Sequence, residues 1–113
     1  MYPYSRLRGP NVLSTLEIVD LCASPERPKA LVFVSSTAVL ECPHYGSLSD
    51  RTGGIRESDD LSGSGGGALR VGYGQSKWVA ERLLSVAGQR GLRGYIVRPG
   101  YVVGDSVSGG ELL

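Results

Sequence analysis

Two short runs of apolar residues, each followed by turn-forming residues, are the clearest pattern in the chain. The first spans residues 30–34 and precedes Ser-Ser-Thr at 35–37, and the second spans 94–98 and precedes Pro-Gly at 99–100. Uninterrupted apolar runs that are rich in β-branched and aromatic side chains are typical of strands buried on both faces of a parallel sheet. The pattern therefore predicts two buried, parallel strands.

Two other stretches have the apolar spacing of helices. Apolar residues recur every three or four positions from Val12 to Ala23, behind Asn11 as a candidate N-cap and before Pro25 as a stop. A second helix is predicted from about Gly72 to Gln89. The segment before Asn11 has no periodicity and contains two prolines, so we predict it to be irregular.

Residues from about 46 to 70 are polar and rich in glycine, and they predict a flexible loop. The glycines at 63–67 do not predict a phosphate loop, because no apolar strand precedes them and no Lys-Ser/Thr pair follows. The order of elements is then helix, strand, loop, helix, strand. This order favours an α/β fold with a parallel crossover, in which ligands bind beyond the carboxyl ends of the strands.

Composition excludes few functions. The 113 residues, with 41% hydrophobic and 20% charged residues and a net charge of +1, suit one small globular domain and give no electrostatic reason to expect nucleic acid or a membrane as partner. The arginines are scattered and are expected on the solvated surface. No apolar run approaches the length of a membrane span, and we expect a cytoplasmic protein.

The two cysteines are too few for a disulfide framework, which agrees with a reducing compartment. Cys22 lies in an apolar helical stretch and is expected to pack as a small hydrophobic residue. Cys42 has only His44 as a neighbouring ligand type, so no metal site is expected.

The most informative pair is Tyr73 and Lys77, four residues apart at the start of the second predicted helix. This spacing places a phenol and an ammonium on one helix face. An ammonium stabilises a nearby phenolate, so such a pair is a general acid suited to neutral pH. The structural alternative is an aromatic at the edge of the core, a solvated lysine, and Ser36 as a simple cap of the strand end.

The residues around this pair resemble the extended short-chain dehydrogenase/reductase family. The resemblance is carried by residues 33–39, by Tyr73-x-x-x-Lys77 and by residues 97–104. Residues 11–15, 72–78 and 93–106 narrow it to the thioester reductase domain of the fungal L-2-aminoadipate reductase family, and the resemblance covers about residues 2–109. Each motif is weak alone, and the combination is specific.

The resemblance implies an NADPH-dependent reductase that converts an aminoacyl thioester on a phosphopantetheine carrier to an aldehyde, on the route to lysine. It assigns Ser36 as the catalytic hydroxyl, with Thr37 as the alternative, Tyr73 as the acid and Lys77 as its partner. The residues that it places at the cofactor are Asn11, Lys77, Pro99, Gly100 and Tyr101.

The sequence departs from the family in one respect. Dinucleotide-binding folds carry a Gly-rich turn after their first strand, and none occurs here. We therefore expect residues 1–113 to be part of a thioester reductase domain: a fragment of a Rossmann-like, doubly wound parallel sheet without the N-terminal dinucleotide-binding half. The alternatives are an inactive, truncated remnant and another extended short-chain enzyme, such as a sugar-nucleotide epimerase.

Overall fold

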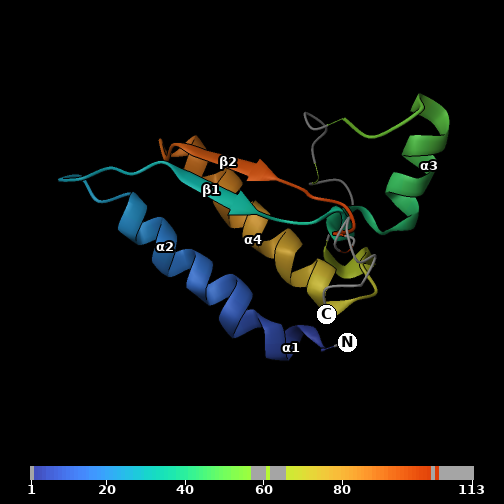
Figure 1. Ribbon diagram of the computed structural model, residues 1–113, viewed down its shortest axis with the longest axis horizontal. Coiled ribbons are helices and arrows are strands. Elements are labelled where there is room, and N and C mark those ends of the chain that lie inside the picture. The colour runs from blue at the N-terminus through green and yellow to red at the C-terminus, as the bar shows by residue number, and fades with distance from the viewer. Residues whose placement is uncertain (1, 57–60, 62–65, 103, 105–113) are drawn as a thin grey trace.

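The computed structural model describes residues 2–56, 61, 66–102 and 104. Its elements form two neighbouring strands, a long helical stretch at the N-terminus, a central helix and a connection that carries a further helix (Figure 1). In chain order they are α1 (Tyr4–Leu7), η1 (Arg8–Leu13), α2 (Ser14–Cys22), β1 (Leu31–Val34), η2 (Thr37–Leu40), α3 (Pro43–Thr52), η4 (Gly66–Ala68), α4 (Gly72–Gln89) and β2 (Gly94–Val97).

The two strands pair in parallel, as the sequence predicts. The register runs from Leu31 opposite Gly94 to Val34 opposite Val97. The chain returns from β1 to β2 through α4, which contacts β2 and also the N-terminal helices. The α/β class and the parallel crossover are therefore confirmed, and the carboxyl ends of both strands lie at one edge of the sheet.

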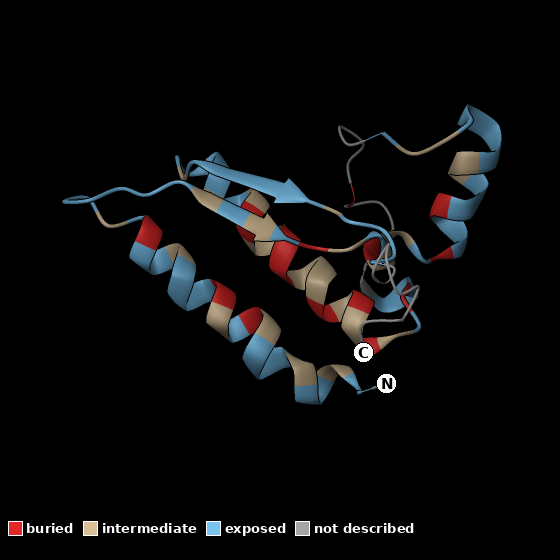
Figure 2. Ribbon diagram, viewed as in Figure 1, coloured by how far each residue is buried: buried red, intermediate tan, exposed pale blue. Residues whose placement is uncertain are grey.

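One face of the sheet is open. Phe33 and Leu31 face a cavity that α2 and α4 also line, whereas the side chains on the opposite face are exposed: Val32 (59%), Val34 (57%), Tyr95 (70%) and Val97 (46%). Figure 2 shows how little of either strand is buried. The prediction of strands buried on both faces is thus wrong for this chain, because the described helices cover the sheet on one side only.

The N-terminal segment is helical, so the prediction of an irregular segment before Asn11 is wrong. The helical stretch begins at Tyr4, after Pro3, and continues without a break to Cys22. Proline is tolerated at the start of a helix. The missing N–H of Pro10 falls in the π-helical segment η1, in which the amide of Ser14 bonds to the carbonyl of Gly9, five residues back. Asn11 is therefore inside a helix rather than at its N-cap.

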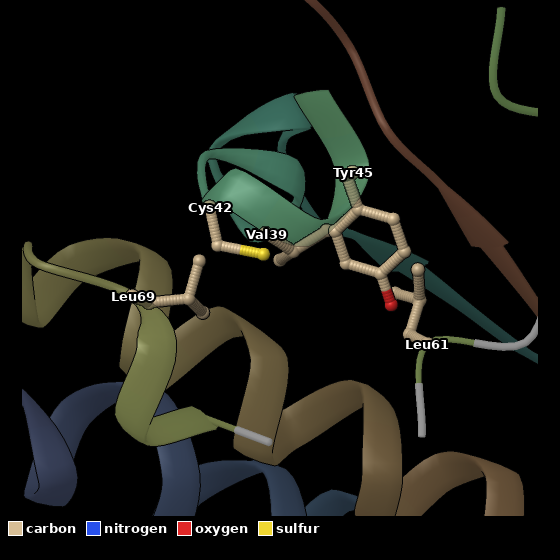
Figure 3. Close-up of a cluster of buried hydrophobic side chains, with 5 residues drawn as sticks. All are labelled: Val39, Cys42, Tyr45, Leu61 and Leu69. Carbon is tan, nitrogen blue, oxygen red and sulfur yellow. The ribbon is translucent and has the colours of Figure 1, made fainter. Parts of the chain in front are cut away.

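The predicted flexible loop from about residue 46 to 70 is wrong for residues 46–52, which belong to α3. Pro43 in the first turn and Gly53, at φ 73° after the last turn, delimit this helix. Most of the Gly-rich run at 63–67 lies outside the described residues. The flanking Leu61 and Leu69 are buried in an apolar cluster with Val39, Cys42 and Tyr45 (Figure 3).

This cluster lies against α4, beyond the strand ends. Trp78 packs against it and donates from Nε1 to the carbonyl of Leu61 at 3.2 Å. Gln75 donates from Nε2 to the carbonyl of Leu69 at 2.7 Å. Two side chains of α4 thus hold both flanks of the glycine run through hydrogen bonds to their backbone.

The first turn of α4 approaches two other backbone segments closely. A Cβ on Gly72 would lie 2.4 Å from the amide nitrogen of Tyr4, and a Cβ on Gly74 would lie 2.7 Å from the carbonyl oxygen of Ala38. Real Cβ atoms essentially never approach backbone this closely, so both positions require glycine. Tyr73, between them, is consequently held against α1 on one side and η2 on the other.

The open sheet face predicts self-association of the 113-residue chain. Contiguous apolar surface beside an exposed strand edge is a site of aggregation. Sedimentation of the purified chain at low micromolar concentration is expected to show dimers or larger species, and Val34→Lys on the open face is expected to raise the monomer fraction. A monomeric chain with a cooperative melting transition above about 50 °C would contradict this expectation.

Replacing Gly74 by alanine is expected to destabilise the chain by about 1–3 kcal/mol, because the added methyl group meets a backbone carbonyl that cannot move freely. Gly88 in the same helix is the matched control, since no described atom beyond the neighbouring backbone of its own helix lies within 4 Å of the position that its methyl group would take. Gly88→Ala is expected to stabilise the helix by roughly 0.5–1 kcal/mol. Urea unfolding followed by circular dichroism measures both, and equal midpoints for the two variants would refute the close contact.

Candidate functional site

Lys77 connects α4 to the end of β1. Its Nζ atom donates to the carbonyl oxygen of Val34 at 2.9 Å, lies 5.0 Å from the centre of the Phe33 ring and lies 5.8 Å from the centre of the Tyr73 ring. The ammonium therefore lies over two aromatic faces, to which its charge is attracted. The helical spacing of Tyr73 and Lys77 brings the phenol and the amine together as the sequence predicts.

Burial lowers the pKa of Lys77 from its usual value of 10.5, because desolvation disfavours the ammonium. The carboxylate of Glu81, one turn further along α4, opposes this effect and raises the pKa. The pKa of Lys77 is therefore below that of a solvated lysine, while the negative charge of Glu81 favours the protonated amine.

A cavity of about 340 Å³ lies at the carboxyl ends of the strands. Ser36, Tyr73, Gly100 and Tyr101, four residues assigned to the site from the sequence, line it together. The other lining residues among those described are Thr37, Ala38, Glu41, Val71 and Val102. Residues from two strand ends and from the first turn of α4 thus converge on one concave surface, where small-molecule sites are usually found.

The hydroxyl of Ser36 is already hydrogen-bonded. Its Oγ accepts from the amide of Ala38 at 3.2 Å and caps the short helix η2. A hydroxyl that accepts one bond still has its proton to donate, so the cap leaves Ser36 able to bind an oxygen in the cavity. Thr37 also lines the cavity, and its amide donates to the carbonyl of Pro99 at 3.1 Å. The choice between Ser36 and Thr37 stays a prediction.

Asn11 lies on a different surface. Its Nδ2 atom donates to Oγ of the fully buried Ser76 at 2.9 Å, and this hydroxyl donates to the carbonyl of Tyr73 at 2.8 Å. Asn11 and Lys77 also line a second cavity of about 190 Å³, between η1, α2 and β1. Asn11 therefore fixes the position of α4, through a partner that no motif in the sequence indicates.

The segment after β2 is attached to the segment after β1. The amide of Ser35 donates to the carbonyl of Val97 at 2.7 Å, and the Thr37–Pro99 bond follows it. Pro99 contributes its carbonyl to this contact and is not among the residues that line the cavity, whereas Gly100 and the exposed Tyr101 are. Ser35 itself is buried, and its hydroxyl has no hydrogen-bond partner among the described residues.

Arg98 is an exception to the expectation of solvated arginines. Its Nε and Nη2 atoms donate to the Glu81 carboxylate at 3.0 and 2.9 Å, and the Glu81 side chain is buried. Sequence reasoning missed this pair, because two charged residues 17 positions apart show no pattern until the helix and the strand pack. A weak hint is that Glu81 lies one turn beyond Lys77, on the apolar side of the helix.

Two kinds of site are absent from the described part of the chain. No group of three or more His, Cys, Asp or Glu side chains in it could hold a metal ion. None of its helices combines the length and the apolar character that a membrane crossing requires.

Comparison with known proteins identifies the family of the chain. The chain matches the NAD-binding family model described as male sterility protein over residues 1–111. It is 56% identical to the L-2-aminoadipate reductase large subunit of Candida glabrata and 53% identical to the L-2-aminoadipate reductase of Saccharomyces cerevisiae. Each alignment covers 96% of this chain and 8% of the relative.

Among solved structures, the chain is similar to the terminal R domain from the myxalamid PKS-NRPS biosynthetic pathway. The TM-score is 0.77 at 45% identity, over 93% of this chain and 24% of that one. The resemblance to the fungal aminoadipate reductases that the motifs indicate is confirmed, and the chain belongs to the NAD-binding family described as male sterility protein.

Proposed function

We propose that this chain is the part of an NADPH-dependent thioester reductase domain that carries the proton donor and one wall of the nicotinamide pocket. The observation that carries the proposal is the single cavity lined by Ser36, Tyr73 and Gly100 at the strand ends. In the complete domain, β1 and β2 would be two strands of a Rossmann-like, doubly wound parallel sheet, and this cavity would lie where such sheets bind ligands.

The residues of the cavity suit carbonyl reduction. A nicotinamide cofactor, when bound, supplies a hydride for the thioester carbon. The hydroxyls of Ser36 and Tyr73 donate hydrogen bonds to the carbonyl oxygen as it becomes negative, where fixed donors have their largest effect. Tyr73 then transfers its proton to that oxygen. The C–S bond then breaks: the oxygen gives up this proton and re-forms the carbonyl, the proton passes to the departing sulfur, and the products are an aldehyde and a free thiol.

Lys77 and Asn11 support cofactor binding in the second cavity. An ammonium and an amide beside an apolar wall suit the hydroxyl groups of a ribose, and the same ammonium would stabilise the phenolate of Tyr73 after proton transfer. The Gly-rich turn that holds a pyrophosphate does not occur in the 113 residues. We therefore assign to this chain the nicotinamide end of the cofactor and not its phosphates, and NADPH in preference to NADH follows the resemblance alone.

The substrate we propose is an acyl thioester on a phosphopantetheine carrier. This proposal is supported by similarity to an R domain of a PKS-NRPS pathway and to L-2-aminoadipate reductases. The 53% identity to the Saccharomyces cerevisiae protein favours an aminoadipyl group and a role in lysine formation.

A segment exchange tests the function. The segment of the Saccharomyces cerevisiae reductase that aligns with this chain is replaced by the chain, and growth without lysine and NADPH oxidation by the purified protein are measured. Activity is expected in the exchanged protein and not in the 113-residue chain alone, which lacks the phosphate-binding turn. Tyr73→Phe is expected to lower kcat by about 10²- to 10⁴-fold, because it removes the general acid.

Tyr95→Phe is the matched control for this exchange, since it removes a phenol hydroxyl that lies outside the Ser36–Tyr73 cavity. Its activity is expected to equal that of the parent. An active Tyr73→Phe protein would contradict the assigned role of the tyrosine, and NADPH oxidation by the isolated chain would contradict the assignment of the phosphate site elsewhere.

The same exchanged protein separates the two candidate hydroxyls. Ser36→Ala is expected to lower kcat by roughly 10²-fold, the effect of removing one donor to a developing oxyanion. Thr37→Val, which keeps the shape of the side chain and loses the hydroxyl, is expected to change kcat by less than about threefold. The opposite order of effects in steady-state kinetics would assign the role to Thr37.

A further inference from the structure

We propose that the ion pair between the buried Glu81 and the partly exposed Arg98 is the positioning device that holds α4 in register with the segment after β2, and so holds Tyr73 opposite Gly100. This inference rests on the proposed function, because it assigns the pair a purpose in that site. Neither residue lines the Ser36–Tyr73 cavity, so both would act through the residues that do.

The contact is suited to fixing an orientation. Three distances join the two groups: Nε to Oε1 at 3.0 Å, Nε to Oε2 at 3.3 Å and Nη2 to Oε2 at 2.9 Å. Paired donors on a planar guanidinium fix both the separation and the angle of the carboxylate, which a single hydrogen bond does not. Glu81 is 3% exposed, so water competes little for this geometry.

The pair joins the two walls of the site. Glu81 lies on α4, one turn beyond Lys77 and two turns beyond Tyr73. Arg98 lies two residues before Gly100, which lines the cavity with Tyr73. The hydrogen bond from the amide of Thr37 to the carbonyl of Pro99 joins this segment to the residues beside Ser36. Displacement of Arg98 relative to Glu81 would therefore change the distance between the proton donor and the opposite wall.

The hydrogen bond between Lys77 and the carbonyl of Val34 also joins α4 to the strands, but it would not hold α4 in position throughout the reaction. Lys77 bonds to the carbonyl of Val34 in this structure, but the proposed function requires the same amine at the cofactor and beside Tyr73. Glu81 influences Lys77 only through its charge, and the hydrogen bonds between Glu81 and Arg98 are separate from that chemistry. The pair therefore keeps its geometry while the hydrogen-bond partner of Lys77 changes.

Stability alone is a poor explanation for the pair. A buried ion pair costs desolvation, and replacing both partners with apolar residues of similar volume is often neutral or stabilising. A positioning role and a stabilising role therefore predict different results for such a replacement. The positioning role predicts loss of rate without loss of stability.

The experiment uses the exchanged Saccharomyces cerevisiae protein with Glu81→Leu/Arg98→Met. The expected result is a fall in kcat of about 10- to 100-fold, the effect of a small misplacement of reacting groups, with KM for NADPH within about threefold and a melting temperature within a few degrees of the parent. Glu17→Leu/Arg93→Met, at two exposed positions, is the matched control and is expected to change none of these quantities.

Arg98→Lys separates geometry from charge. It keeps both charges, and with them the effect of Glu81 on Lys77, but loses the planar fork of donors. The positioning role predicts that kcat falls in Arg98→Lys nearly as far as in the double variant. A parent-like kcat in Arg98→Lys would overturn the proposal. An unchanged kcat in Glu81→Leu/Arg98→Met would also overturn it, as would a loss of kcat that is fully explained by a loss of folded protein.

Hydrogen exchange provides a readout that does not need activity. In Glu81→Leu/Arg98→Met the amides of Ser35 and Thr37, which donate to the carbonyls of Val97 and Pro99, are expected to exchange at least about tenfold faster, while those of α3 stay unchanged. Unchanged exchange at the strand ends would refute the positioning role. An exchanged parent protein that oxidises no NADPH would refute the proposed function, and hydrogen exchange would still decide whether the pair holds the two walls together.

Discussion

The geometry of the site depends on how closely the first turn of α4 approaches its neighbours. Glycine at positions 72 and 74 removes the side chains that would otherwise separate this turn from Tyr4 and from the carbonyl of Ala38. Tyr73 is then located by backbone against backbone, a contact with little freedom to relax because interiors are close-packed. Lys77 and Glu81 attach the next two turns to the ends of the strands, so the whole helix is held in one place.

Much of this arrangement can be predicted from the residues themselves. An uninterrupted apolar run indicates a strand, and a helix between two such runs indicates a parallel pair, so the strands, α4 and the edge that holds the site all follow. The open sheet face does not follow. Apolar residues indicate which faces of a strand are buried in the complete fold. Whether a face is exposed here depends on whether this chain contains the helices that pack on it.

The contacts of the candidate site that the sequence does not predict share one physical cause. Periodicity locates a residue on a helix face, but it does not identify the partner from another element. The proximity of Tyr73 and Lys77 can be predicted because both lie on one helix, and that of Ser36 and Gly100 because the strand ends meet at one edge. Arg98 and Glu81 come from different elements, and their pairing depends on a packing angle that no spacing in the sequence encodes. The hydrogen bond from Asn11 to Ser76 likewise joins two elements, and its formation depends on how they pack.

The π-helical turn at η1 has a consequence for how the N-terminal helix changes with sequence. A turn that holds one additional residue rotates everything before it by about 100° relative to everything after it. The helix therefore presents two differently oriented faces, one from α1 and one from α2, and both contact α4. Loss of a single residue from η1 would rotate α1 about the helix axis without moving the axis itself. Tyr4, whose backbone lies against Gly72, would then turn away from the first turn of α4.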